Sequence, residues 1–285
     1  MNPLDDKKRA ELIDRANGIR CSVIESLMEA GSGHTAGSLG MADIFTALYF
    51  HILKHDPTDP LWEERDRLVL SNGHICPVLY ASMAHSGYIP LEELKTLRRL
   101  GSRLQGHPHR EYLPGLETSS GPLGCGLSQA VGMAIANRMD RGPSSERYFY
   151  ALLSDGEMNS GNTWEGGMLA AKERLSNLVA VIDRNSIQID GYTEDVMPLE
   201  PLVDKWRSWG WGVTEIDGHN FDEIVSAFEE GRSYSDGPFM IIANTTPGKG
   251  VSEFEGRYEW HGKVPSAEEG ERALAELRDV LNENF

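Results

Sequence analysis

The sequence predicts an α/β protein with a mostly parallel sheet and helices on both of its faces. Two observations favour this fold class. Short apolar runs bounded by turn residues recur along the chain, and longer segments with helical periodicity separate them. An alternation of this kind is typical of parallel strands that are covered by helices. Ligands of such sheets bind outside the carboxyl ends of the strands, so functional residues are expected in the loops that follow the strands.

The expected elements follow one another along the whole chain. A charged amphipathic helix covers about residues 5–30, a glycine-rich loop (GSGHTAGSLG) follows it, and an apolar helix covers 41–53. The buried strands are RLVLS (67–71), YFYALLS (148–154), LVAVID (178–183), WGVTEID (211–217) and FMIIANT (239–245). Further helices are expected at 76–86, 123–140, 163–174, 201–209, 221–231 and 266–282. This order predicts a single domain over residues 1–285, with a C-terminal helix within about 266–285.

The segment from about residue 87 to 124 differs from the rest. It contains the stretch GSRLQGHPHREYLPGLETSSGPLGCG, which is rich in glycine, proline, histidine and arginine and has little periodicity. Loops of this length inside a compact domain are usually functional or disordered. Because this segment carries apolar residues and closely spaced glycines, we expect an ordered active-site loop.

Composition excludes several classes of protein. A net charge of −17 argues against a general nucleic-acid surface, which needs stripes of lysine and arginine. No apolar run reaches the roughly 20 residues that span a bilayer, so we expect no membrane segment. The three cysteines, Cys21, Cys76 and Cys125, are widely separated, which argues against a zinc ribbon or a disulfide framework. The charged N-terminal sequence has no apolar signal, so we expect a cytoplasmic protein.

Two polar stretches follow neighbouring strands of the predicted sheet. SDGEMNSG places Asp155 after the strand at 148–154, and DRNSIQIDG places Asn185 after the strand at 178–183. If these strands are adjacent, both side chains emerge at the same edge, where a carboxylate and an amide suit Mg²⁺ or Ca²⁺. Taken singly, each residue is better explained as an ordinary turn former.

The spacing of these stretches resembles the diphosphate-binding signature of thiamine-diphosphate enzymes. In that group the carboxylate, the amide and a main-chain carbonyl two residues later bind the cation that holds the cofactor's diphosphate. The resemblance therefore implies that Asp155, Asn185 and the carbonyl of Ile187 are metal ligands. The signature normally begins Gly-Asp-Gly, and here Ser154 replaces the first glycine.

Four further stretches resemble transketolase, in the same order and spacing. GSGHTAGSLG contains His34, LSNGH contains His74, QGHP contains His107, and ETSSGPLGCGLSQAVGMA contains the Gly121-Pro122-Leu123 triplet. The resemblance covers about residues 10–265. It implies the diphosphate domain of the thiamine-diphosphate-binding fold, and a transferase that moves a two-carbon ketol unit between sugars, as in carbohydrate metabolism.

The resemblance also implies roles for individual residues. His34, His74 and His107 would line the substrate channel as catalytic residues, because proton exchange with sugar oxygens suits imidazole. The cofactor would contact residues of four segments, namely His74, Gly121, Pro122, Leu123, Asp155, Gly156, Asn185 and Ile189. Transketolases carry a His-x-x-His-Gly element near the end of this domain, and EWHG matches only its second histidine. His261 therefore either takes over a catalytic role or merely packs.

Transketolases of full length contain a second, pyrimidine-binding domain for which this chain has no counterpart. The resemblance implies the N-terminal subunit of a split transketolase, active with a C-terminal pyrimidine-binding subunit in an assembly of two copies of each chain. Sugar phosphates are the implied substrates. The family commonly has glutamate where this chain has Ser160, in a carboxylate network that also includes Glu165, so we expect altered coupling between active sites.

Two other interpretations stay open at this point. One is a different thiamine-diphosphate enzyme subunit, similar to deoxyxylulose-phosphate synthase or to an oxo-acid decarboxylating component. The set of three histidines favours sugar ketol transfer, because hydroxylated substrates need such partners. The other interpretation is a non-catalytic module that has kept the cofactor fold.

Overall fold

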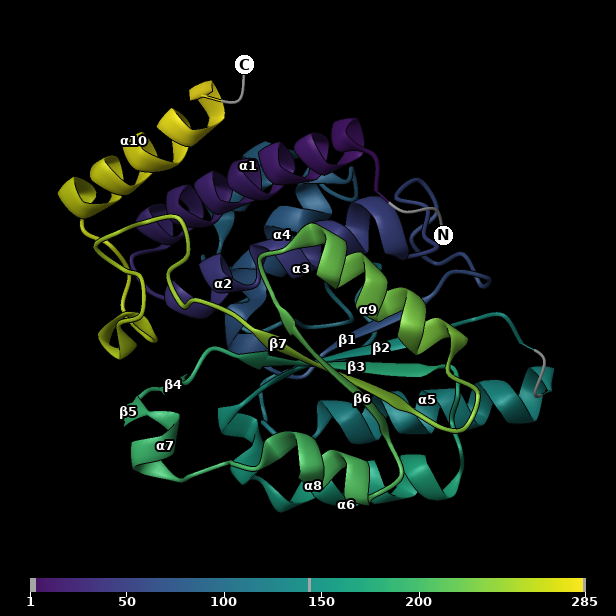
Figure 1. The fold of residues 1–285 in the computed structure, drawn as a ribbon. Coiled ribbons are helices and arrows are strands. Elements are labelled where there is room, and N and C mark those ends of the chain that lie inside the picture. Colours follow the sequence, from purple (N-terminus) through teal and green to yellow (C-terminus); the bar gives the residue numbers. More distant parts are fainter. Residues whose placement is uncertain (1–3, 143–144, 284–285) are drawn as a thin grey trace.

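Five parallel strands form the central sheet, in the order β1-β2-β3-β7-β6 (Figure 1). A computed structural model describes residues 4–142 and 145–283. The strands are β1 (Arg67–Leu70), β2 (Phe149–Ser154), β3 (Leu178–Arg184), β6 (Gly212–Asp217) and β7 (Phe239–Asn244). The predicted fold class is confirmed, and each predicted strand agrees with the structure to within one residue.

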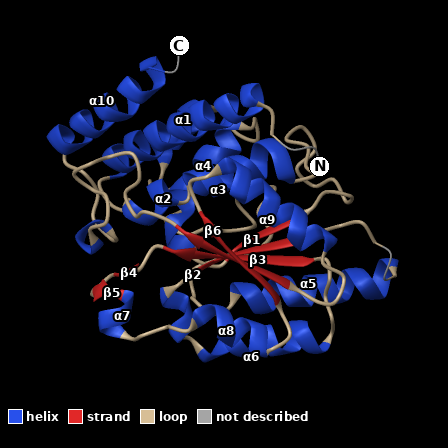
Figure 2. Cartoon of the chain, in the orientation of Figure 1, coloured by secondary structure: helices blue, strands red, loops and turns tan. Residues whose placement is uncertain are grey.

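Helices cover both faces of this sheet (Figures 1 and 2). One face carries α1 (Asp6–Ala30), α2 (Ala36–Gly40), α3 (Ala42–Ala47), α4 (Cys76–His85), α9 (Phe221–Ser233) and α10 (Ala267–Glu283). The other face carries α5 (Gly126–Arg141), α6 (Gly161–Lys172) and α8 (Leu202–Ser208). Residues 1–3 and 284–285 of the predicted domain, including the end of the predicted terminal segment, lie outside the described residues.

The three central strands, β2, β3 and β7, are buried along nearly their whole length, whereas the edge strand β6 is mostly half-buried or exposed. In β2, Tyr150 and Leu152 belong to the apolar core under α1, α3, α4 and α9, whereas Phe149, Ala151 and Leu153 belong to the core over α5, α6 and α8. Successive side chains of a strand point to opposite faces, so one continuous apolar run supplies two separate cores. Packing against these two cores sets the position and the direction of the carboxyl end of each strand.

The glycine-rich stretch at 31–40 was predicted as a loop, and this is wrong for its second half. Ala36–Gly40 form the short helix α2, and every residue of it is buried. A Cβ on Gly37 would lie 2.9 Å from Ile75 Cγ2, and one on Gly40 would lie 3.0 Å from the carbonyl oxygen of Thr246. The small residues here allow close packing of a buried helix and do not provide a flexible loop.

The other helices agree with the sequence pattern apart from their ends and a few short elements. The predicted apolar helix 41–53 is α3 followed by a single π-helical turn at Leu48–Ile52. A small hairpin of β4 (Ile187–Gln188) and β5 (Gly191–Tyr192) leads into α7 (Thr193–Val196). Short 3₁₀ helices occupy Gly73–Ile75, Leu91–Thr96, Gly156–Asn159 and Tyr258–Trp260. The three cysteines are free thiols, and no helix in the described part of the chain is long and apolar enough to cross a membrane.

Candidate active site

The loops at the carboxyl ends of β1, β2 and β3 converge on one cavity of about 300 Å³. Its lining combines residues from several separate segments, namely His34, His74, His107, Gly121, Leu123, Ser154, Gly156, Asn185, Ile187, Gln188, Ile189 and His261. All of these were predicted as site residues from the sequence except Ser154 and Gln188. Of the other two predicted residues, Asp155 is fully buried between two of the lining positions, and Pro122 is exposed outside the lining.

Asp155 follows β2 directly and is held by several donors. Its Oδ2 accepts hydrogen bonds from the Ser186 amide at 2.7 Å, the Arg184 guanidinium at 3.0 Å and the Thr193 hydroxyl at 3.3 Å. Its Oδ1 accepts one from the Gly156 amide at 2.7 Å. Burial raises the pKa of Asp155, and these donors oppose that rise. Ser186 has a left-handed φ of 62°, which turns the chain after β3 so that its amide faces this carboxylate.

Asn185 lies beside Asp155 because β2 and β3 are neighbours in register, with Ser154 opposite Asp183. The amide of Asn185 donates to Asp183 Oδ2 at 2.7 Å, and its Oδ1 accepts from the Ile187 amide at 3.0 Å. Asp183 is itself buried and also accepts a hydrogen bond from Thr245 at the end of β7. Burial raises the pKa of Asp183 to about 7. The amide of Asn185 is thus fixed in orientation by its neighbours.

These oxygens suit a hard divalent cation that is shared with a phosphate ligand. The described residues contain no group of three or more His, Cys, Asp or Glu side chains that could bind a metal by itself. A cation at this edge would rely on one carboxylate, one amide and a backbone carbonyl, and on oxygens of the bound ligand. Asp155 Oδ1 carries a hydrogen bond from Gly156 alone, so it keeps lone-pair capacity. The residues present therefore fit the cation and the diphosphate.

Part of the cavity wall is apolar. Leu123 and Ile189 line it, and although they are apolar they are 42% and 63% exposed. Gly121 lies next to them, and a Cβ at this position would come 3.6 Å from the ring of His107. A flat apolar ring system fits between such side chains better than a polar ligand does. This wall suits the ring end of a cofactor whose diphosphate lies near Asp155.

Three histidine rings meet at the mouth of the cavity. The ring centroids of His34 and His74 are 5.0 Å apart, those of His74 and His261 are 5.1 Å apart, and those of His34 and His261 are 5.6 Å apart. Burial, reinforced by the neighbouring imidazoles, lowers the pKa of His34 to about 4 and that of His74 well below its ordinary value. Burial also lowers the pKa values of His107 and His261.

These histidines are neutral at pH 7, and each neutral ring has one donor and one acceptor nitrogen. His34 Nδ1 is buried and has no hydrogen-bond partner among the described residues. Neutral imidazoles that face a cavity can hold hydroxyl groups and can move protons to or from their oxygens. This arrangement suits a hydroxylated substrate.

Acidification destabilises the protein through His34. The folded pKa of about 4 lies below the ordinary 6.5, so between these values the unfolded chain binds a proton that the folded chain does not. The contribution of neutral His34 to the free energy of unfolding is therefore complete above pH 6.5 and is lost as the pH falls towards 4. Thermal unfolding midpoints measured across this window should fall less steeply for His34→Gln than for the unchanged chain. Identical slopes would contradict the assignment.

Sequence reasoning missed three residues at this site. Ser154 and Gln188 line the cavity, and Arg98 lies against Gly106, the residue before His107. The Arg98 guanidinium is so close to Gly106 that a Cβ there would lie 2.8 Å from Nη1, and its charge helps to lower the pKa of His34 and His107. Gln188 sits one residue after a predicted ligand, which was a usable signal. Nothing in the sequence around Arg98 indicates that this exposed arginine turns towards the histidines.

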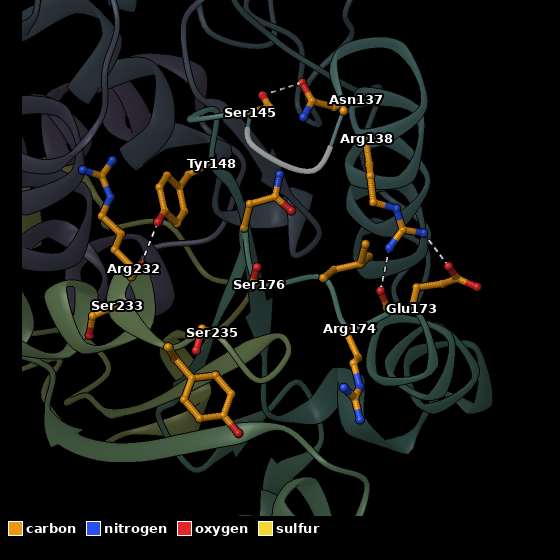
Figure 3. A pocket seen from close by; sticks show the side chains of 14 residues that line it. Asn137, Arg138, Ser145, Tyr148, Glu173, Arg174, Ser176, Arg232, Ser233 and Ser235 are labelled. Carbon is orange, nitrogen blue, oxygen red and sulfur yellow. Dashed lines mark hydrogen bonds and ion pairs between the residues drawn. The ribbon is translucent and has the colours of Figure 1, made fainter.

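A second cavity, of about 330 Å³, lies at the opposite edge of the sheet (Figure 3). Its arginines lie near the C-terminal ends of α5, α6 and α9, where positive charge offsets the helix dipole. Arg138 is paired with Glu173, and Tyr148 donates to the carbonyl of Arg232 at 2.7 Å (Figure 3). Because these polar groups are already hydrogen-bonded or ion-paired with one another, this cavity is not the candidate site.

Comparisons with known proteins identify the family to which the chain is similar. The family described as "Transketolase, thiamine diphosphate binding domain" matches residues 13–281. The 6-deoxy-6-sulfo-D-fructose transketolase subunit SqwG of Clostridium sp. (strain MSTE9) is 46% identical, with 95% of this chain and 98% of that protein covered. An apulose-4-phosphate transketolase subunit of Phocaeicola vulgatus is 41% identical, with 92% of each chain covered.

The fold comparison leads to the same family. A transketolase structure from Campylobacter jejuni matches with a TM-score of 0.88 at 36% identity, over 94% of this chain and 42% of that one. The chain thus spans less than half the length of that transketolase and nearly the full length of the two subunits. It belongs to the transketolase family, as a transferase subunit that consists of the thiamine-diphosphate-binding domain.

Proposed function

We propose that the chain is the N-terminal subunit of a two-chain transketolase, which transfers a two-carbon ketol unit from a ketose phosphate to an aldose phosphate. The observation that carries this proposal is that His34, His74, His261 and Asn185 line one cavity, with Asp155 buried directly beside its lining residues Ser154 and Gly156. Two relatives of the same length are named as transketolase subunits, which supports a separate partner chain. A cytoplasmic location stays a prediction from the sequence.

Thiamine diphosphate supplies the carbon–carbon bond chemistry of such an enzyme when it is bound. We propose that Asp155, Asn185 and the carbonyl of Ile187 hold Mg²⁺, or Ca²⁺ in its place, and that the cation bridges to the diphosphate. His74 and Gly156 would lie against the diphosphate, and Gly121, Leu123 and Ile189 against the rings, whereas Pro122 lies outside the cavity lining. The apolar side chains would exclude water from the reacting carbon.

The histidines would act on the sugar. His34, His74 and His107 would bind its hydroxyl and carbonyl oxygens as neutral rings and exchange protons with them. His261 stacks on His74 with an interplanar angle of 30°, which favours a place in the active site over a packing role. The names of both relatives describe a sugar with an anionic group, a sulfonate or a phosphate, so the donor of this chain is proposed to carry one as well.

The partner is proposed to be a C-terminal, pyrimidine-binding subunit, with two copies of each chain in a heterotetramer. The test is co-purification with such a subunit, followed by a thiamine-diphosphate-dependent assay of ketose phosphates, a sulfonated ketose and pyruvate. Transfer of a two-carbon unit from a ketose supports the proposal. Product formed from pyruvate alone would favour a deoxyxylulose-phosphate synthase-like or decarboxylating enzyme. A monomeric chain that no partner activates would favour a non-catalytic cofactor-binding module.

Ser160 is predicted to change the coupling between the active sites of the assembly. A Cβ on Gly124 would collide with the Ser160 hydroxyl, and next to it Gly124, Cys125 and Glu165 line a surface recess. A glutamate at position 160 would bring a second carboxylate near Glu165. In the assembled complex, Ser160→Glu should therefore alter the cooperativity of cofactor binding, measured as the Hill coefficient. Binding and turnover identical to those of the unchanged complex would refute the prediction.

A further inference from the structure

Glu157 is a buried carboxylate that the proposed mechanism does not use. It lies in the 3₁₀ turn Gly156–Asn159 after β2, and it is 1% exposed. Burial raises its pKa, and the groups that oppose this rise are one hydroxyl and two backbone amides. A carboxylate in such a position is costly unless each of its hydrogen bonds is well formed. Its contacts therefore need an explanation.

The carboxylate joins three segments that are far apart in the sequence. Glu157 Oε1 accepts hydrogen bonds from the Gly124 amide at 2.6 Å and from the Ser71 hydroxyl, and Oε2 accepts one from the Ser154 amide at 3.3 Å. The Ser71 oxygen in turn accepts a hydrogen bond from the Gly126 amide at 3.0 Å. The end of β1, the start of α5 and the end of β2 are thus tied to one side chain.

In each of these segments, residues that line the candidate active site lie within a few positions of the residue that takes part in the Glu157 network. His74 follows Ser71, Gly121 and Leu123 precede Gly124, and Gly156 precedes Glu157. The segments are also packed closely, since a Cβ on Gly73 would lie 2.7 Å from Ser120 Cβ and 3.0 Å from the Gly121 amide nitrogen. Gly124 has a φ of 89°, a left-handed conformation that glycine adopts without steric cost. The hydrogen bond from its amide to Glu157 anchors the loop in this conformation.

We infer that Glu157 is a positioning residue that holds the segment Gly121–Leu123 in place for the cofactor. The inference rests on the proposed function, because it takes Gly121 and Leu123 to contact thiamine diphosphate. A carboxylate has two acceptor oxygens and can serve the Ser71, Gly124 and Ser154 donors together. A glutamine has one acceptor oxygen, and its NH₂ group would face a donor. Because Glu157 sets the shape of this part of the cavity wall, its replacement is expected to lower the affinity for the cofactor.

The test is Glu157→Gln in the complex with the partner subunit. We expect the thiamine diphosphate concentration for half-saturation, in the presence of Mg²⁺, to rise roughly 10- to 100-fold, as for the loss of a hydrogen bond to a charged group. We expect kcat at saturating cofactor to stay within about threefold, because Glu157 does not line the cavity. Calorimetric titration of the complex with cofactor and Mg²⁺ measures the affinity independently of turnover.

Asp66→Asn is the matched control. Asp66 is likewise a buried carboxylate that accepts from two backbone amides, Tyr148 at 2.9 Å and Lys54 at 3.0 Å, but it lies before β1 at the opposite edge of the sheet. This variant should lower the unfolding temperature and leave the half-saturating cofactor concentration unchanged. A Glu157→Gln complex that behaves in the same way would overturn the inference and leave Glu157 a purely structural role.

Ser71→Ala is a milder variant that keeps the carboxylate. It removes the hydroxyl that links Glu157 to the Gly126 amide and should raise the half-saturating concentration roughly 3- to 10-fold. If Glu157→Gln does not fold, an unchanged half-saturation in Ser71→Ala overturns the inference. An unchanged complex that binds no thiamine diphosphate would overturn the proposed function itself, and the two failures are therefore distinguishable.

Discussion

Replacing Asp155 with alanine is expected to abolish the Mg²⁺-dependent retention of thiamine diphosphate by the assembled complex. The carboxylate is the one charged oxygen ligand in the proposed cation site, and the amide of Asn185 and a backbone carbonyl alone hold a divalent cation weakly. The change also removes the acceptor of the Gly156 and Ser186 amides, whose hydrogen bonds are partly buried, and therefore lowers folding stability as well. Gel filtration followed by assay of bound cofactor measures the retention.

Loss of stability has to be separated from loss of the cation site. Asp43→Asn is the appropriate control, because Asp43 is also buried and paired with an arginine, Arg20, but is not one of the proposed cation ligands. This variant should retain cofactor although it is less stable. Asn185→Ala should lose cofactor as Asp155→Ala does. Full retention in either cation-site variant would remove the metal assignment.

His74→Ala is expected to lower kcat by about 10²–10⁴-fold at saturating cofactor, which is the usual contribution of a positioned acid–base group. The ring contacts those of both His34 and His261, so its loss removes one of the three members of the cluster. Because the ring is neutral and no ion pair is broken, we expect a small change in the free energy of unfolding. Single-turnover kinetics with the ketose donor separate this step from product release.

His85→Ala is the matched control for His74→Ala. His85 ends α4, is hydrogen-bonded to Ser22 at 2.9 Å and does not line the cavity. Its loss should leave kcat unchanged. His261→Ala belongs in the same experiment: a loss of kcat like that of His74→Ala assigns His261 a catalytic role, and no loss assigns it to packing. A His74→Ala complex with kcat within about threefold of the unchanged complex contradicts the catalytic role of His74.

The centre of the sheet was predictable from the sequence because β2, β3 and β7 are buried on both faces. Segments such as LVAVID are apolar throughout and end at a polar turn, so their position could be predicted to within one residue. The helix α2 could not be predicted in the same way. Glycine and alanine in AGSLG are equally common in loops, and what makes them helical is close contact with Ile75 and Thr246, which lie far away in the sequence.

The residues of the candidate site likewise fall into two groups: those whose position follows from the sequence, and those that only tertiary contacts bring to the site. Asp155 and Asn185 follow adjacent strands, so the order of the strands alone brings them together. His261 lies more than 150 residues from both His34 and His74, and no local pattern indicates that its ring stacks on that of His74 and meets that of His34 edge-on. Glu157 and Pro122 are complementary cases. A glutamate in a polar turn is buried, whereas a proline in a motif assigned to the cofactor is exposed outside the cavity.

The exposed apolar wall of the cavity has a consequence for how the protein is produced in a cell. Leu123 and Ile189, together with Val196 and Met197 on the adjoining α7 segment, are between 42% and 63% exposed. Exposed apolar surface of this kind promotes self-association and the capture of unrelated proteins. If the proposed partner covers this wall, a surplus of unassembled chains would aggregate or be degraded. Synthesis of the two chains in matched amounts would then be a condition for a high yield of active enzyme.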